Sequence, residues 1–153
     1  MTRVDLIRKI ESERKTRVIS YITSNRPPFA TRIADDVVPL LGNLLDSIGK
    51  TKKISLLLFT SGGDMLVPIR IVKLIRNYCD EFEVLVPYKA HSAGTLICLG
   101  ADNIVMGKLG ELTPVDPTTG HPFNPQNPNN PCQQLEVSVE DLNSYLLFAK
   151  ERA

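Results

Sequence analysis

Ser92 is the residue in this sequence whose type and setting best suit nucleophilic chemistry. It stands between Ala90 and Gly94 in the segment AHSAG, where an expected strand gives way to an expected helix. Small neighbours permit the sharp turn that exposes a nucleophilic hydroxyl. Serine at the start of a helix is also the usual N-cap, so the segment alone leaves both interpretations open.

A glycine pair, Gly62 and Gly63, forms a second loop of the same kind. Glycines allow close approach of a substrate to the backbone, and unpaired N–H groups at a helix start can stabilise an oxyanion. A glycine turn that merely joins strand to helix is the other interpretation. Because the carboxyl ends of parallel strands meet at one edge of a sheet, we expect the N–H groups of Gly62 and Ala93 to point at the same oxyanion.

Hydrophobic periodicity predicts the elements that must position these loops. Short apolar or β-rich runs predict strands, and apolar residues at helical spacing predict helices. Expected strands cover 17–23, 54–59, 82–87 and 103–106, and expected helices cover 2–15, 33–48, 65–79 and the segment from 137. Alternating strands and helices indicate an α/β domain with a largely parallel sheet and right-handed crossovers.

Composition narrows the possible functions. The chain has 153 residues and a net charge of +1, which suits one domain over 1–153 and gives no basic excess for nucleic acid. Three scattered cysteines and two histidines predict no metal site, and we expect no cofactor. The charged N-terminus and the lack of a long apolar run predict a cytoplasmic protein without a membrane span.

The C-terminal part of the sequence has a different character. Residues 118–136 are rich in proline and asparagine, and a loop of this length in a compact domain is typically functional. The sequence stops inside the last expected helix, which suggests a truncated chain.

Two segments together resemble a known family. TSGGD, followed about thirty residues later by AHSAGTLICLGADNIVMGKLGELTPVDP, is similar to the serine dehydrogenase proteinase family, which is related to the Clp protease proteolytic subunit and to signal peptide peptidase A. The resemblance covers roughly residues 50–117. It implies a Clp protease/crotonase-like spiral of ββα units, ATP-independent hydrolysis of peptides or proteins, and a homo-oligomer, either a trimer or a larger ring. It also implies Ser92 as nucleophile, with Gly63 supporting Gly62 and Ala93 in the oxyanion hole.

The general base is the open part of the site. The family order of serine, aspartate and histidine implies Asp116 and His121, and the related serine–lysine dyads make Lys108 and Lys150 alternatives. A lysine base would have to be desolvated. His91 adjoins Ser92, and because neighbouring side chains diverge we expect it to orient the loop or contact substrate.

Two other functions stay possible on sequence grounds. One is a catalytically inactive module of the same fold that binds peptide or assembles a complex. The other is a crotonase-type acyl-CoA enzyme, which uses the same kind of glycine-loop oxyanion hole but does not need a nucleophilic serine.

Overall fold

The computed structural model describes residues 2–116, 118–119, 124–128 and 130–152. The chain divides into two compact units, Met1–Val115 and Asp116–Ala153. The first contains Ser92 and the glycine pair, and the second begins at Asp116.

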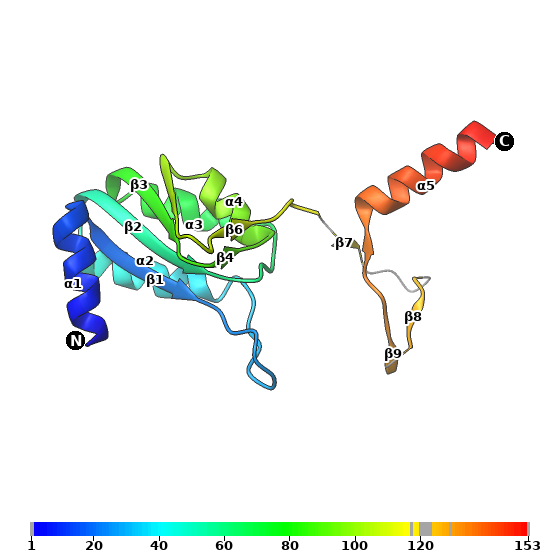
Figure 1. The fold of residues 1–153 in the computed structure, drawn as a ribbon, viewed down its shortest axis with the longest axis horizontal. Helices are drawn as coiled ribbons and strands as arrows, with labels where there is room; N and C mark the ends of the chain where they lie inside the picture. Colours follow the sequence, from blue (N-terminus) through cyan, green and yellow to red (C-terminus); the bar gives the residue numbers. More distant parts are fainter. Residues whose placement is uncertain (1, 117, 120–123, 129, 153) are drawn as a thin grey trace. The chain divides into compact units, whose positions relative to one another are not determined.

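A four-stranded parallel sheet forms the centre of the first unit (Figure 1). Its order is β1 (Arg17–Ile22), β2 (Thr51–Phe59), β3 (Cys79–Val86) and β5 (Asn103–Met106). The two central strands carry fully buried side chains such as Leu56 and Val84, as expected for parallel strands covered on both faces. All four predicted strands are confirmed, and β2 and β3 each begin three residues earlier than expected.

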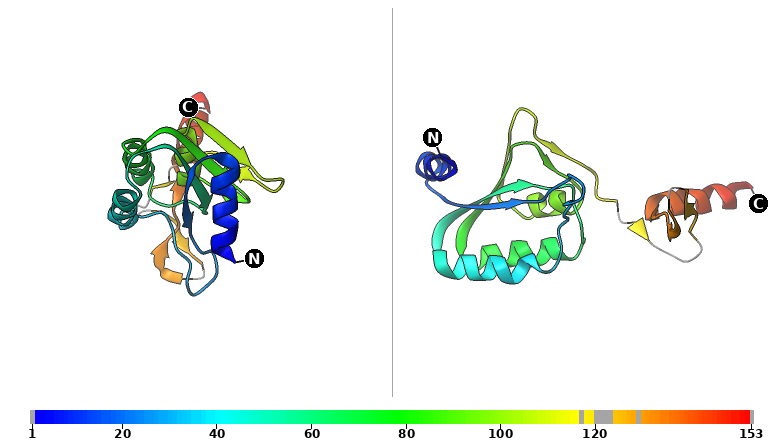
Figure 2. Two further views of the ribbon diagram at one scale, coloured as in Figure 1. Left: turned by 90° about the vertical axis from the view of Figure 1, so that its left-hand side faces the viewer. Right: turned by 90° about the horizontal axis from the view of Figure 1, so that it is seen from below.

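Helices lie on both faces of this sheet (Figure 2). Helices α2 (Val37–Ile48) and α3 (Val67–Arg76) cover one face, and α1 (Arg3–Arg14) lies on the other. Helix α4 (Ala93–Leu99) packs against α3. Between the sheet and α2–α4 lies the apolar core, which includes the fully buried Leu45, Ile71 and Ile97.

Helix α2 begins four residues later than the periodicity predicts. Ile33, the expected first residue, instead forms a parallel bridge with Gly63. Its N–H donates to the Gly62 carbonyl at 2.9 Å, and its own carbonyl accepts from the Asp64 N–H at 2.8 Å. Because both backbone groups of Ile33 are engaged by the glycine loop, Ile33 is held as extended chain rather than in a helix.

Short extended segments form a second layer beside the large sheet. Strand β4 (Lys89–Ala90) pairs in parallel with β6 (Glu111–Leu112), and Thr60 bridges to Ala90. Each long strand β1, β2 and β3 is therefore followed by a short extended segment and then by a helix. This repetition confirms the predicted ββα units with a largely parallel sheet.

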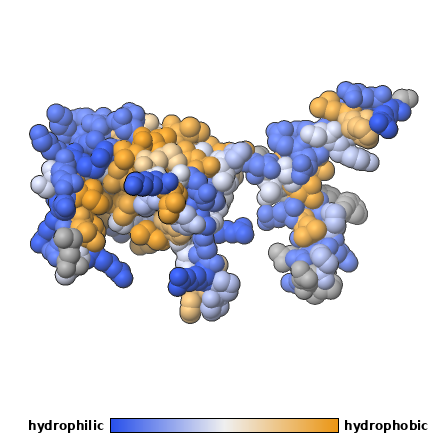
Figure 3. All heavy atoms as spheres, viewed as in Figure 1, coloured by the Kyte–Doolittle hydropathy of each residue, from blue (hydrophilic) through white to orange (hydrophobic). Residues whose placement is uncertain are grey.

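Helix α1 buries none of its side chains. It is attached instead by polar contacts, notably the ion pair of Arg14 with Glu83 on β3 and the hydrogen bond that the Val18 N–H donates to the Glu11 carboxylate at 3.0 Å. Apolar side chains also reach the surface over the middle of this unit (Figure 3). Separately, the apolar side chains of Ile104, Val105 and Met106 on β5 are exposed.

The second unit contains two short antiparallel pairs and a helix. Strand β7 (Thr118–Thr119) pairs with β10 (Val137–Ser138), and β8 (Gln126–Asn127) pairs with β9 (Asn130–Gln134). Helix α5 (Val139–Arg152) follows. The Ser138 hydroxyl accepts from the Asp141 N–H at 3.2 Å and so caps the start of this helix.

Candidate active site

Ser92 occupies a sharp turn between β4 and α4. Its backbone has φ 50° and ψ −114°, and among the described residues other than glycine only Lys15 shares a positive φ. Such a conformation costs a non-glycine residue about 1–3 kcal/mol and is typical of functional sites. A serine raised on a strained strand-to-helix turn is the geometry of a nucleophile elbow.

The neighbours of Ser92 explain how the turn fits. Ala90 and Ala93 are fully buried, and Gly94 lies against Thr60. A Cβ atom at Gly94 would lie 2.5 Å from the Thr60 side chain, which is closer than real Cβ atoms approach. The small residues recognised in the sequence are therefore needed for close packing of α4 onto the end of β2.

The glycine pair lies directly against the serine. Gly62 has φ 101°, and a Cβ atom there would lie 2.9 Å from the Ser92 Cβ and 3.0 Å from the His91 carbonyl oxygen. At Gly63, with φ 153°, a Cβ atom would lie 2.2 Å from the Ile33 carbonyl oxygen. Both positions require glycine, and the structure brings the two loops together.

The backbone N–H groups around Ser92 differ in whether they are engaged. The Gly62 N–H, expected to face an oxyanion, donates to the buried Thr60 hydroxyl at 3.0 Å. The N–H groups of Gly63 and Ala93 have no acceptor within the part of the chain that the structure describes. Gly63, which follows Gly62, and Ala93, which follows Ser92, therefore offer two free donors in the two loops that meet here.

The Ser92 hydroxyl and the Ser92 N–H each have one described partner. Its Oγ atom contacts the Met65 sulfur at 3.5 Å, and the Ser92 N–H donates to the Thr113 hydroxyl at 2.9 Å. Among the described residues, no histidine, lysine or carboxylate forms a hydrogen bond with the Ser92 Oγ atom.

The two predicted base residues, Asp116 and His121, do not belong to the first unit. His121 lies outside the described residues. Asp116 begins the second unit, where its carboxylate accepts from the Ser138 hydroxyl at 2.9 Å. Of the alternative bases, Lys108 is exposed in the turn after β5, and Lys150 is exposed on α5.

Two other charged or polar side chains near the loops have structural partners. The His91 ring nitrogen Nε2 lies 2.9 Å from the Glu111 carboxylate on β6. The Asp64 carboxylate accepts from the Leu66 N–H at 2.8 Å. It therefore has a structural role, because it stabilises the turn that leads into α3.

Sequence reasoning missed a set of threonines behind the elbow. Thr60 holds the Gly62 N–H, and Thr113 holds the Ser92 N–H. The Thr95 hydroxyl lies 2.9 Å from both the Ala90 and the Thr113 carbonyl oxygens. No spacing rule points to these residues, because their contacts depend on how three separate segments align.

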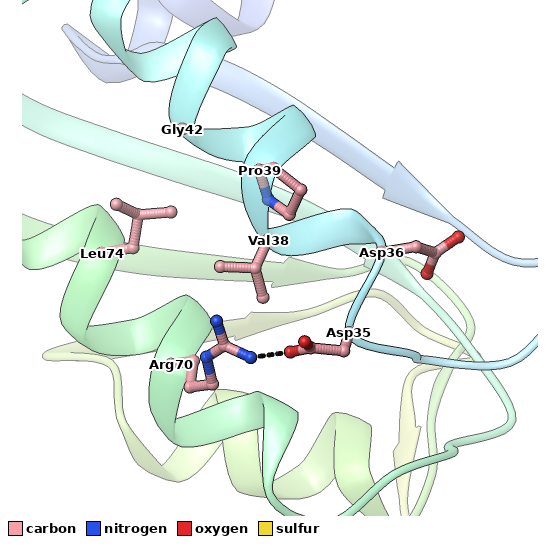
Figure 4. Close-up of a pocket in the computed structure, with 7 residues that line it drawn as sticks. All are labelled: Asp35, Asp36, Val38, Pro39, Gly42, Arg70 and Leu74. Carbon is pink, nitrogen blue, oxygen red and sulfur yellow. Dashed lines mark hydrogen bonds and ion pairs between the residues drawn. The ribbon is translucent and has the colours of Figure 1, made fainter.

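The structure has a separate open hollow between α2 and α3 (Figure 4). Arg70 and Asp35 form an ion pair across it, with Val38, Pro39 and Leu74 on its apolar side. None of the predicted site residues lines this hollow.

The described ranges contain no cluster of three potential metal ligands. They also contain no helix long and apolar enough to cross a membrane.

Comparison with known proteins identifies a family that this chain matches. The model of the ClpP-like SDH-type serine proteinase family matches residues 1–127. Two uncharacterized proteins of Methanocaldococcus jannaschii, MJ0137 and MJ1495, are 32% and 33% identical to this chain over 127 and 128 residues. Each alignment covers 78% of this chain but only 44% and 43% of the relatives, so the chain spans less than half of their length.

Proposed function

Because this chain belongs to the ClpP-like SDH-type serine proteinase family, we propose that it is part of a serine peptidase with Ser92 as its nucleophile. The observation that carries the proposal is the elbow itself. Ser92 has a positive φ and lies against Gly62, and the N–H groups of the next residue in each loop, Gly63 and Ala93, have no acceptor among the described residues.

In the proposed reaction the Ser92 Oγ atom attacks the carbonyl carbon of a peptide bond, and its proton passes to a general base. The N–H groups of Ala93 and Gly63 donate to the resulting oxyanion, and each such donor is worth about 3 kcal/mol in transition-state stabilisation. The base then gives its proton to the leaving amine, and water hydrolyses the acyl-enzyme.

The role of Gly62 differs from the expectation drawn from the sequence. Its N–H is already bound to the Thr60 hydroxyl at 3.0 Å, so we assign the oxyanion donor to Gly63 instead. Gly62 provides the close approach, since any side chain there would collide with Ser92.

We propose His121 as the general base and Asp116 as the residue that orients it. The proposal rests on the order of Ser92, Asp116 and His121 in the chain, which matches the serine–aspartate–histidine order of the family that the sequence resembles. Lys108 and Lys150 are the alternatives, and either would make the site a serine–lysine dyad.

The wider properties are proposed on the same basis. The substrate is an extended peptide or protein segment that adds as a strand beside the glycine loop. Hydrolysis is independent of ATP, the protein is cytoplasmic, and it assembles as a homo-oligomer, a trimer or a larger ring.

Hydrolysis of an unstructured protein such as casein, by the assembled protein, tests the proposal. We expect Ser92→Ala to remove activity and Ser47→Ala to retain it, because the Ser47 hydroxyl is exposed on α2 and bonds only to the Leu44 carbonyl. His121→Ala, compared with Lys108→Ala and Lys150→Ala, identifies the base. Full activity in Ser92→Ala would refute the proposal.

One observation supports a second function, an inactive module that binds peptide. Among the described residues no base contacts the Ser92 Oγ atom. On this alternative the wild-type protein binds an extended peptide with the same affinity as Ser92→Ala and cleaves nothing.

A further inference from the structure

We propose that Thr113 is a positioning residue, whose hydroxyl holds Ser92 in the elbow conformation through the backbone N–H of the serine. This inference rests on the proposed function, in which Ser92 is the nucleophile. Thr113 does not touch the reacting atoms; it acts through the peptide group that precedes them.

The backbone contacts of the elbow show why Thr113 matters. The His91 N–H donates to the Thr60 carbonyl at 3.1 Å, and the Gly94 N–H donates to the His91 carbonyl at 2.8 Å. These bonds are made by the backbone and survive any side-chain substitution. The Ser92 N–H is the exception, because its acceptor is the Thr113 hydroxyl at 2.9 Å.

The conformation of Ser92 makes this bond consequential. At φ 50° a serine is outside the regions that L-residues readily adopt, so the surrounding contacts must hold it there. A hydrogen bond to the Ser92 N–H fixes the peptide plane between His91 and Ser92. Through φ, that plane sets the direction in which the Ser92 Cβ and Oγ atoms leave the backbone of the elbow.

Thr113 is itself held firmly enough to serve this purpose. It follows Leu112, which pairs with Ala90 in the short parallel sheet. The Thr95 hydroxyl accepts from the Thr113 N–H at 3.3 Å and lies 2.9 Å from the Thr113 carbonyl oxygen. Since Thr95 is buried on α4, the helix that follows Ser92 holds Thr113 in place, and Thr113 in turn holds Ser92.

Two substitutions separate the hydroxyl from the bulk of the side chain. Thr113→Val keeps the branched shape and removes the acceptor, whereas Thr113→Ser keeps the acceptor and removes the methyl group. We expect Thr113→Val to slow labelling of Ser92 by a fluorophosphonate probe about 10- to 100-fold, the range set by one unsatisfied, partly buried N–H. Thr113→Ser is expected to stay within threefold of the wild type.

Steady-state hydrolysis gives a readout that general loosening of the fold would not mimic. We expect Thr113→Val to lower kcat with little change in KM, because the bond places the nucleophile and not the substrate. Far-UV circular dichroism and urea unfolding show whether Thr113→Val is folded. Labelling of a folded Thr113→Val at the wild-type rate would overturn the inference and leave the proposed peptidase intact.

Amide hydrogen exchange tests the inference without any catalytic readout. We expect the Ser92 amide of the wild type and of Thr113→Ser to exchange at least tenfold more slowly than that of Thr113→Val. The Leu96 amide, which donates to the Ser92 carbonyl, serves as the internal reference and should be unchanged. If the wild type takes up no probe, the proposed function fails, but the exchange rate of the Ser92 amide still tests the role of Thr113. Exchange as fast in the wild type as in Thr113→Val overturns that role, and slower exchange in the wild type supports it.

Discussion

Removing the charge of Glu83 is expected to destabilise the first unit strongly. Glu83 lies on the central strand β3 and is 1% exposed. Its carboxylate accepts from Arg14 Nε at 2.8 Å and from the Ser55 hydroxyl at 2.7 Å, and Lys53 Nζ lies 3.4 Å away. These partners, Arg14 first, hold the pKa of Glu83 at about 2 instead of 4.5, although burial opposes them.

The lowered pKa gives the size of the effect. The pKa of this carboxyl is 4.5 in the unfolded chain and about 2 in the folded chain. The difference contributes about 3 kcal/mol to the free energy of unfolding at neutral pH. Because the folded pKa is the lower one, this stability is fully present above pH 4.5. It is lost as the pH falls through the folded pKa near 2.

The assay is urea unfolding of the whole chain followed by far-UV circular dichroism, since the sequence has no tryptophan. At pH 7 we expect Glu83→Gln to cost about 3 kcal/mol, because it removes the buried carboxylate that Arg14 and Lys53 share. The control is Glu81→Gln on the same strand. Glu81 pairs with Lys53 at 2.8 Å but its side chain is 38% exposed, so its loss should cost under about 1 kcal/mol.

The pH dependence provides the refutation. The difference in unfolding free energy between the wild type and Glu83→Gln should shrink as the pH is lowered from 5 towards 2, while that of Glu81→Gln should stay small throughout. Equal costs for the two variants at pH 7, or a Glu83→Gln cost that does not change with pH, would show that the ion pair does not stabilise the sheet as argued.

Two further predictions concern the elbow and the core. Gly62→Ala should abolish probe labelling of Ser92, because Gly62 has φ 101° and the new Cβ would lie 2.9 Å from the Ser92 Cβ. The control is Gly42→Ala on α2, where the new Cβ meets open space; it should leave labelling unchanged and stabilise the chain by up to about 1 kcal/mol. Equal labelling of the two variants would contradict this prediction. Burial raises the pKa of the Cys98 thiol to about 12. Iodoacetamide at pH 8 should therefore leave Cys98 unmodified in the folded protein and alkylate it in urea, as measured by peptide mass spectrometry. Alkylation of Cys98 in the folded protein at the rate of the unfolded chain would contradict its buried position.

The sequence predicted the large sheet well because its strands are apolar in a simple pattern. The run 54–59 is almost continuously apolar, and it became the buried part of β2. Helix α2 shows the limit of such reasoning, since periodicity placed its start at Ile33. That residue bonds to the glycine loop, a contact between distant segments that no local pattern reports.

The candidate site divides in the same way. The elbow and the glycine pair were recognisable because strained turns restrict residue types, and the structure places Gly62 against Ser92. The engagement of the Gly62 N–H was not predictable, because it depends on the position of the Thr60 hydroxyl. The hydrogen bond from the Ser92 N–H to the Thr113 hydroxyl was missed for the same reason, because it follows from the register of β4 and β6.

The central claim is that Ser92 is an activated nucleophile, and a fluorophosphonate probe tests it most directly. The assembled wild-type protein is treated with the probe and digested, and the modified peptide is identified by mass spectrometry. We expect one modified serine, Ser92, with labelling lost in Ser92→Ala and greatly slowed in His121→Ala. A folded, assembled protein that takes up no probe at Ser92 would contradict the claim.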